Sequence, residues 1–213
     1  MAAIAQWRLN GNANDVLALS NGTSTNITWQ AGIEHGSAYF NGVSSVINIP
    51  STYFKFPNTT FTVSGWIKAA RTSTNGAIMA FNGVTAGWAV FTSGSGYLQV
   101  LLKGSGTNCL TAIGTKYIIL DNNWHYLCAI ITTSTTNINS NNVIMYVDGK
   151  LETATGVPTS VYNYNSTDNL TIGRRNIASP YYYKGNIDAI LIDNAAWTNN
   201  MILNKYLFYK GII

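Results

Sequence analysis

Carboxylate side chains are the first candidates for chemistry, because two Asp or Glu residues aimed at one sugar can hydrolyse a glycosidic bond. The 213-residue chain has eight Asp and Glu residues, and its only two Glu are Glu34 and Glu152. Neither Glu has a carboxylate two positions away, the spacing that places two side chains on one face of a strand. Asp188 and Asp193 differ in parity, so on a regular strand they face opposite sides. A catalytic carboxylate pair is therefore not expected.

Other catalytic side chains are equally sparse. His35 and His125 are isolated in the sequence, and no His or Cys spacing typical of a zinc site is present. Cys109 and Cys128 are too few to indicate a disulfide scaffold, so we expect free buried thiols and leave their pairing open. We predict that the protein is not an enzyme. The alternative is a glucanase-like hydrolase whose carboxylates the spacing does not reveal.

Side chains suited to binding rather than catalysis gather between residues 162 and 182. A shallow sugar site needs flat aromatic faces together with amide and guanidinium donors. The candidate ligand-binding residues are Tyr162, Tyr164, Arg174, Arg175, Asn176, Tyr181 and Tyr182, with Trp88 from a separate glycine-bearing loop. The alternative is that the loop tyrosines only cover the edges of a sheet.

Three consecutive tyrosines divide by strand parity. Tyr183 continues the odd-numbered face of Ile187, Ala189 and Leu191, so we expect it to be structural. The preceding proline weakens strand pairing at Tyr181. Tyr181 and Tyr182 are therefore predicted to be exposed at the rim, beside the two adjacent arginines.

The elements that position these residues are strands. Runs of period two, rich in Val, Ile, Tyr and Thr, alternate with turn signals such as Asn41-Gly42 and Asp148-Gly149. One short helix is expected near the end of the chain, where Thr198 is a suitable cap. The pattern predicts an all-β sandwich or barrel forming a single domain over residues 1–213. Trp66, Trp124 and Ile190 are predicted to be buried.

Composition narrows the range of partners. Charged residues make up 9% of the chain and the net charge is +4, but the basic residues are scattered along the sequence. Nucleic acid as a partner is therefore not expected, since it requires a clustered basic surface. No run reaches transmembrane length, so membrane insertion is not expected either. The first residues have no basic segment followed by a long apolar one, which predicts synthesis in the cytoplasm without a signal peptide.

Five motifs occur in a characteristic order. They are "WRLNGNAND" (7–15), "GSAYFNGVSSVINIP" (36–50), "FTVSGWIKA" (61–69), "NWHYLCAII…VIMYVDGKLE" (123–152) and "LTIGRR…YYYKGNIDAILIDNAAW" (170–197). In this order they resemble the laminin-G-like branch of the concanavalin A-like lectin/glucanase superfamily. The resemblance implies a two-sheet antiparallel jelly-roll sandwich with one convex and one concave sheet, and it covers nearly the whole chain.

The same resemblance implies a structural calcium ion. Relatives of this kind often hold calcium with side-chain and backbone oxygens, and such ligands suit the ion. The candidate ligands here are Asp188, Asn10, Asn41 and Gly42, the last through its carbonyl oxygen. Relatives often have Asp where this chain has Asn10 or Asn41.

These observations predict a non-enzymatic protein that recognises glycans or adheres to a surface. A neutral composition rich in Asn, Thr, Tyr and Gly is similar to that of bacteriophage virion proteins, such as head decorations, head fibres and tail-fibre lectins. The expected place is therefore the virion surface, and the expected partner is a glycan or another virion protein. The main alternative is a carbohydrate-binding module of a secreted bacterial protein, and a homo-oligomer is possible in either setting.

Overall fold

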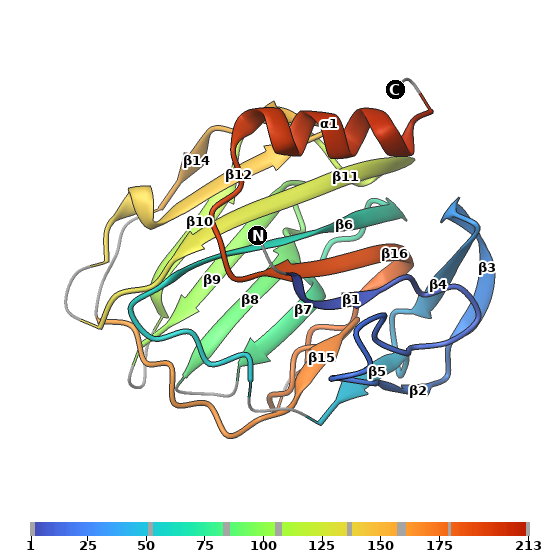
Figure 1. The fold of residues 1–213 in the computed structure, drawn as a ribbon, viewed down its shortest axis with the longest axis horizontal. Helices are drawn as coiled ribbons and strands as arrows, with labels where there is room; N and C mark the ends of the chain where they lie inside the picture. The colour runs from blue at the N-terminus through green and yellow to red at the C-terminus, as the bar shows by residue number, and fades with distance from the viewer. Residues whose placement is uncertain are drawn as a thin grey trace.

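Two stacked antiparallel β-sheets form the protein in a computed structural model, which describes residues 3–50, 53–82, 86–104, 108–135, 138–156, 161–178 and 180–211 (Figure 1). The predicted all-β sandwich with a short C-terminal helix is confirmed. Within these ranges, no helix combines the length and apolar character that crossing a bilayer requires.

The first sheet contains the longest strands. Its order is β13 (Lys150–Leu151), β12 (Val143–Val147), β11 (Asp121–Thr132), β6 (Thr60–Ala70), β16 (Lys184–Asp193), β4 (Gly36–Asn41) and β3 (Thr28–Glu34), with β1 (Ala3–Trp7) paired to β16. A short 3-10 helix, Ser140–Asn142, precedes β12. The predicted turn between β12 and β13 is present, since Asp148 and Gly149 have positive φ values of 52° and 74°.

The second sheet lies against the first. Its order is β14 (Ala154–Thr155), β10 (Asn108–Gly114), β9 (Leu98–Lys103), β8 (Gly87–Thr92), β7 (Gly76–Asn82), β15 (Leu170–Ile172), β5 (Val46–Ile49) and β2 (Thr23–Thr25). β15 and β5 come from distant parts of the chain, yet they pair through Leu170 with Ile49 and Ile172 with Ile47. This non-local pairing brings together the residues of the candidate site.

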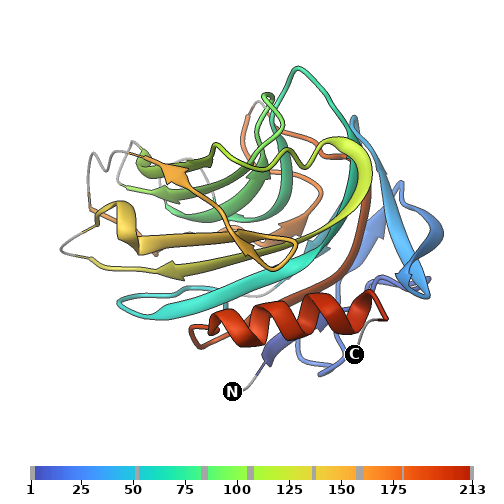
Figure 2. The ribbon, with the colours of Figure 1, turned by 90° about the horizontal axis from the view of Figure 1, so that it is seen from above.

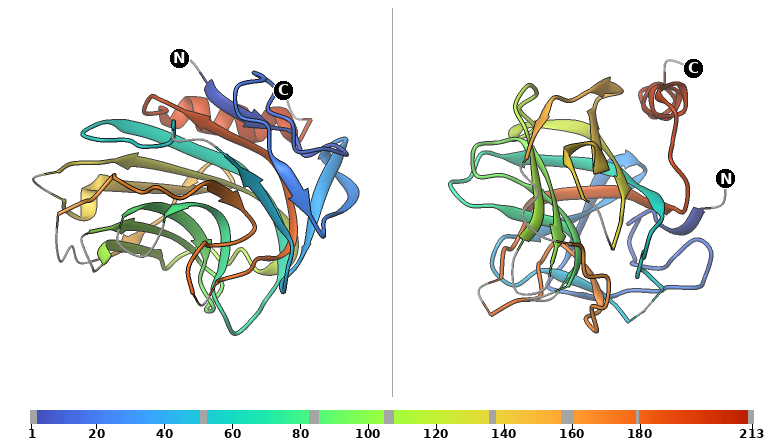
Figure 3. Two further views of the ribbon diagram at one scale, coloured as in Figure 1. Left: turned by 90° about the horizontal axis from the view of Figure 1, so that it is seen from below. Right: turned by 90° about the vertical axis from the view of Figure 1, so that its left-hand side faces the viewer.

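A helix, α1 (Asn199–Tyr209), covers the outer face of the first sheet (Figures 2 and 3). The predicted cap is present, because the Thr198 side chain accepts a hydrogen bond from the Met201 N–H at 3.4 Å. Trp66 is fully buried beneath the helix, with its ring stacked on Tyr206 at a centroid distance of 5.8 Å. The molecule therefore has three layers, in the order helix, first sheet and second sheet.

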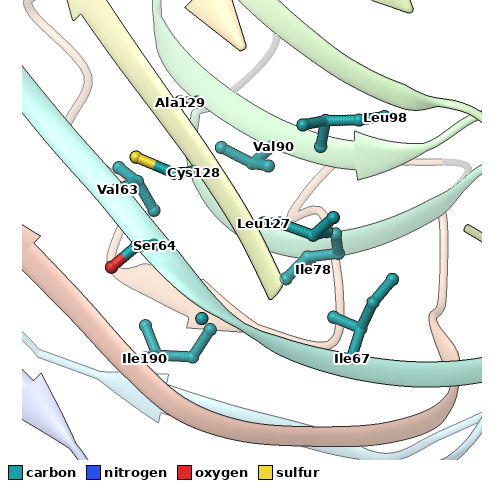
Figure 4. Close-up of a pocket in the computed structure, with 11 residues that line it drawn as sticks. Val63, Ser64, Ile67, Ile78, Val90, Leu98, Leu127, Cys128, Ala129 and Ile190 are labelled. Atoms are coloured by element: carbon teal, nitrogen blue, oxygen red, sulfur yellow. The ribbon is translucent and has the colours of Figure 1, made fainter. Parts of the chain in front are cut away.

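The core between the sheets is tightly packed. Ile67, Leu127 and Ile190 of the first sheet and Ile78 and Val90 of the second line a cavity of about 10 Å³ (Figure 4). So small a space holds about one water molecule at most, and its lining is largely apolar. This cavity is a packing void and not a ligand site.

The burial predictions are confirmed at two positions and corrected at a third. Trp66 and Ile190 are buried, at 0% and 1% exposure. Trp124 is only half-buried, because it lies near the start of β11 and packs at the margin of the apolar cluster under α1. Cys128 has a free buried thiol, whereas the side chain of Cys109 is outside the described residues.

A β-bulge in β16 changes the expected strand parity. The pairing with β6 shifts register between Asp188 and Leu191, and Ala189 lies within the shift with a φ of 49°. Ala189 and Leu191 consequently pack under α1, while Ile187 packs in the core between the sheets. The prediction that Asp188 and Asp193 face opposite sides is therefore wrong, since the extra residue places both on the α1 side of the sheet.

Candidate functional site

A polar hollow of about 240 Å³ lies on the outer face of the second sheet, where β15, β5 and β2 are adjacent. We call it the amide hollow, and it is lined by Thr25, Val46, Asn48, Asn169, Thr171, Arg174 and Asn176. Strand alternation explains its polarity, because Ile47 and Ile49 are buried in the core while Asn48 between them faces outward. The lining supplies amides, hydroxyls and one guanidinium, which are the groups that hydrogen-bond sugar hydroxyls.

Hydrogen bonds hold Arg174 and Asn176 at this hollow. An Arg174 terminal nitrogen donates to Asn176 Oδ1 at 2.6 Å, and Asn176 Nδ2 donates to Asp168 Oδ1 at 3.0 Å. The Thr171 hydroxyl donates to the Arg174 carbonyl oxygen at 2.5 Å, which fixes the backbone of the intervening turn. The turn itself contains Gly173 at a φ of 82°, a conformation that favours glycine. These side chains are therefore positioned before any ligand binds.

The burial of the three consecutive tyrosines largely follows the prediction. Tyr183 is 1% exposed and packs edge-on against Phe40 in the core, whereas Tyr181 is 38% exposed. Tyr182 is half-buried rather than fully exposed, because its ring centroid lies 6.0 Å from the Arg174 guanidinium carbon. Tyr182 thus lies beside the amide hollow, and its use by a ligand remains a prediction.

Tyr181 belongs to a second cluster on the same face. Its ring centroid lies 5.9 Å from the Arg175 guanidinium carbon and 6.0 Å from the ring of Phe91. Arg175 is only 8% exposed, so much of its surface is covered by its neighbours. The two adjacent arginines therefore occupy different environments, and Arg174 is the one that lines the amide hollow.

Two predicted ligand-binding residues are structural instead. Trp88 is fully buried, and its indole N–H donates to the Phe54 carbonyl oxygen at 3.0 Å. The reason is that β8 begins at Gly87 and directs Trp88 into the core, against Phe61. Tyr162 is 3% exposed and packs in the same core. Neither ring has a face for a ligand, and Tyr164 is half-buried against the core margin.

Several residues of the amide hollow were missed by sequence reasoning. Asn48 carries a usable signal, because it is the polar member of the alternating run "VINI". Thr171 carries the same signal in "LTI". Thr25 and Asn169 carry none, since only the pairing of strands distant in sequence brings them to this face.

The four predicted calcium ligands do not form one site. Asn41 pairs with Lys184 of β16, and Lys184 precedes Asp188 by four residues. At ~3.3 Å per residue, Asn41 and Asp188 are therefore roughly 13 Å apart along the strand. Ligands of one calcium ion lie within about 2.6 Å of it, so Asp188 cannot share an ion with Asn41 or Gly42. Asn41 Oδ1 instead accepts hydrogen bonds from the N–H groups of its own turn, at 2.8–3.2 Å. Asn10 lies apart from that turn, against Gly36 at the start of β4.

Asp188 is a buried carboxylate held by backbone groups. Its Oδ2 accepts hydrogen bonds from the N–H groups of Ile33 at 2.7 Å and Glu34 at 2.9 Å. Its Oδ1 is buried and has no hydrogen-bond partner among the described residues. Burial raises the pKa of Asp188 to about 6, because hydrogen bonds from backbone N–H groups only partly offset the loss of solvent and Glu34 adds charge repulsion.

His125 lies between two carboxylates, that of Asp148 in the β12–β13 turn and that of Asp121 at the start of β11. Its Nδ1 is 2.8 Å from Asp148 Oδ2, and its Nε2 is 2.9 Å from Asp121 Oδ1. Burial by itself lowers the pKa of His125, but the hydrogen bonds and charges of the two carboxylates outweigh it and leave the pKa raised. Asp148 Oδ1 also accepts a hydrogen bond from the Tyr126 N–H, so the cluster fixes a hairpin. Within the described part of the chain, no group of three or more His, Cys, Asp or Glu side chains is arranged so that it could hold a metal ion.

The sandwich, its curved sheets and a polar outer face define a lectin-like jelly roll. A laminin G family model, described as the concanavalin A-like lectin/glucanases superfamily, matches residues 40–202. This match covers well over half of the 213 residues, so the chain belongs to that superfamily. No protein of curated function matches the sequence.

Solved structures agree in fold at low sequence identity. Domain 4 of AbnA, a GH43 extracellular arabinanase from Geobacillus stearothermophilus solved with arabinotriose, is 18% identical with a TM-score of 0.71. That match covers 95% of this chain and 97% of the arabinanase domain. The binding domain of botulinum neurotoxin DC, solved with SialylT, is 12% identical with a TM-score of 0.67, and the match covers 96% of this chain but 50% of the toxin domain.

A third structure extends the range of protein types. A Trypanosoma rangeli sialidase is 14% identical with a TM-score of 0.66, over 99% of this chain and 33% of the sialidase chain. The present chain therefore spans about half of the toxin domain and a third of the sialidase, but nearly all of the arabinanase domain. At these identities the likeness establishes the fold alone.

Proposed function

We propose that this domain binds glycans, without hydrolysing them, through the amide hollow on the outer face of the second sheet. The observation that carries the proposal is a shallow polar hollow beside the ring of Tyr182, in which Arg174 and Asn176 are held by hydrogen bonds and Asn48 adds a second amide. Amides and a guanidinium can donate to several sugar hydroxyls at once, and a tyrosine face can pack on a pyranose or furanose ring.

Binding is favoured over hydrolysis by the state of the carboxylates. Hydrolysis needs two carboxyl groups flanking one glycosidic bond. The amide hollow is lined by no carboxylate among the described residues, and the nearest one in its hydrogen-bond chain, Asp168, accepts from Asn176 and Ser166. A single engaged carboxylate cannot supply both an acid and a nucleophile. Release of reducing ends from β-glucans by the purified domain would overturn this part of the proposal.

Two structurally similar proteins support a saccharide as the ligand. The arabinanase domain was solved with arabinotriose, and the toxin binding domain was solved with SialylT. The superfamily description itself names lectins and glucanases. Because the fold likeness does not identify the sugar, the ligand class is an oligosaccharide in general.

A glycan array followed by calorimetry tests the proposal. Asn48→Ala should abolish or weaken by at least tenfold the binding of any oligosaccharide captured by the parent. Asn165→Ala is the matched control, because Asn165 is an exposed amide of a nearby loop that does not line the hollow. Equal losses in both variants, or no capture of any glycan, would contradict the proposal.

The biological setting we propose is the surface of a bacteriophage virion. Its support is compositional, since only 9% of the residues are charged and neutral polar side chains are abundant among the rest. The alternative setting is a carbohydrate-binding module of a secreted bacterial protein. Gene neighbours encoding capsid or tail proteins favour the first setting, and neighbours encoding secreted glycosidases favour the second.

A further inference from the structure

All eight carboxylates of the chain are engaged inside the molecule. Five of them accept hydrogen bonds from backbone N–H groups, namely Asp15, Asp121, Asp148, Glu152 and Asp188. The other three have side-chain partners: Glu34 pairs with Arg8, Asp168 with Asn176, and Asp193 with Trp197. The acidic residues are therefore occupied, and Lys68, Arg71, Lys150 and Lys184 are among the basic residues that form no ion pair in the described part of the chain.

Three of those cations line one hollow on the outer face of the first sheet, on the opposite side of the molecule's core from the amide hollow. This second hollow has a volume of about 190 Å³, and we call it the lysine hollow. Its polar lining residues are Tyr39, Lys68, Arg71, Thr72, Asn122, Lys184 and Asn186. It lies where β6 ends and β16 begins, which are adjacent because the two strands run antiparallel (Figure 1).

Strand register explains why these residues come together. Asn186 pairs with Lys68 on β6 and with Tyr39 on β4, so the three side chains form a row across three neighbouring strands. Lys184 and Arg71 are exposed beside this row. These residues come from widely separated parts of the sequence, so the scattered basic residues become one cluster only in the fold.

The electrostatic state of the lysine hollow indicates an anion. Among the described residues, Lys68, Arg71 and Lys184 have no carboxylate within ion-pair distance. The acidic residue at the adjoining end of β11 is Asp121, but its carboxylate is bound to His125 and Asn123. The Arg71 guanidinium donates to a neutral carbonyl oxygen, that of Ser95, at 2.9 Å, which leaves its charge uncompensated.

We propose that the lysine hollow binds a small tetrahedral oxyanion, which is the phosphate or sulfate group of an anionic ligand. Lysine ammonium groups act as point charges for such an anion, and an arginine adds directed N–H donors. The amide of Asn122 and the hydroxyl of Tyr39 supply neutral donors at the same hollow. Three cations in a space of this size match one multiply charged group better than an extended polyanion, which requires a basic stripe.

NMR titration with inorganic phosphate and inorganic sulfate tests this site directly. Chloride at equal ionic strength serves as the reference, since it screens charges without matching the geometry. We expect saturable shifts at Gly185, Asn186 and Asn122 with either oxyanion and small unsaturated shifts with chloride. The absence of saturable shifts with both oxyanions would overturn the proposal.

A second titration distinguishes free oxyanions from esters. Sulfated dextran presents sulfate esters on a sugar chain, and unmodified dextran presents the same chain without charge. Saturable shifts at the lysine hollow with sulfated dextran alone would support esters as ligands of this site. Equal shifts with both polymers would show that the hollow recognises the sugar chain instead, which would overturn the proposal.

Charge variants separate this site from general surface electrostatics. Lys68→Gln and Lys184→Gln should each weaken oxyanion binding roughly fivefold, the size typical of one exposed charge pair. Lys150→Gln is the matched control, because Lys150 is an exposed cation on β13 away from the hollow. Equal weakening by the control, or shifts spread over all lysines, would overturn the proposal. Asn48→Ala should leave oxyanion binding unchanged, so failure here is distinguishable from failure of the glycan proposal.

Discussion

The outer faces of the two sheets differ in what covers them. On the first sheet, α1 covers an aromatic cluster that includes Trp66, Tyr126 and Tyr146. On the second sheet, the centre of the outer face has a smaller buried cluster that includes Ala80, Ala89 and Phe91, and no described helix lies over it. The difference indicates that aromatic side chains on the first sheet stabilise a third layer, while the second sheet keeps hydrogen-bond donors available to a ligand.

The largest effect should come from the covered face. Trp66→Ala is expected to lower the free energy of unfolding by about 3–5 kcal/mol, because it removes a fully buried indole between sheet and helix. Chemical denaturation monitored by circular dichroism measures this change. A loss below about 1 kcal/mol would show that α1 does not depend on this contact and would remove the contrast between the two faces.

The tyrosine run sharpens the comparison within one short segment. Tyr183→Ala should cost about 3 kcal/mol or more, since its ring is buried against Phe40. The double variant Tyr181→Ala/Tyr182→Ala should melt within a few degrees of the parent and weaken glycan binding. Thermal denaturation and calorimetry measure both variants. A stable Tyr183→Ala variant together with an unstable double variant would show that the strand register is off by one residue.

Strand periodicity and turn chemistry were sufficient to predict an all-β sandwich or barrel, the helix cap at Thr198 and the burial of Tyr183, and the order of the five motifs then indicated the two-sheet sandwich. They were insufficient at β16, because an alanine gives no sequence signal for a positive φ. The positive φ of Ala189 accompanies a bulge that reverses the face of the residues that follow. Trp88 was misplaced because β8 already begins at Gly87, a glycine that the sequence pattern attributes to a loop.

Neither hollow could be predicted from local sequence patterns, and the reason differs from that for β16 and Trp88. The amide hollow depends on β15 pairing with β5 and on β5 pairing with β2, and the period of a strand does not specify its partner. The lysine hollow depends in the same way on β4, β16 and β6 lying side by side. Residue types that look scattered along the chain are therefore clustered on the folded surface.

Asp188 makes the covered face sensitive to pH. Its folded-state pKa of about 6 is above its ordinary value of 3.8, so between these values the folded protein retains a proton that the unfolded chain has lost. Stability should therefore fall as pH rises from about 4 to about 6, by up to roughly 2–3 kcal/mol at ~1.4 kcal/mol per unit of pKa. Asp188→Asn should remove this dependence and stabilise the protein at pH 8, as measured by urea denaturation.

Asp188→Asn also tests the calcium expectation. A cation bound at Asp188 would offset the buried negative charge, so EDTA would lower the melting temperature of the parent and leave the variant unaffected. Because Asp188 lies far from Asn41 and Gly42, we expect no effect of EDTA on either protein. A parent that excess calcium stabilises, together with a destabilised Asp188→Asn variant, would contradict this expectation.

His125 should give a smaller effect in a different pH range. Because its folded-state pKa is raised above 6.5, its contribution is fully present below that value and is lost as pH rises through the folded-state pKa. The loss should be about 1 kcal/mol or less, since both partners are partly exposed. Denaturation of His125→Gln above and below neutrality measures it, and an unchanged pH slope would show that the two carboxylates do not charge the imidazole.

The outer face of the second sheet, over which no described helix lies, is the proposed glycan-binding face, and this assignment is central to the contrast between the two sheets. The most direct measurement is an NMR titration of the labelled domain with the oligosaccharide that scores highest on a glycan array. We expect saturable shifts at Asn48, Asn169, Thr171 and Asn176, with α1 unperturbed. Shifts centred on α1 or the first sheet, with the amide hollow silent, would contradict the assignment.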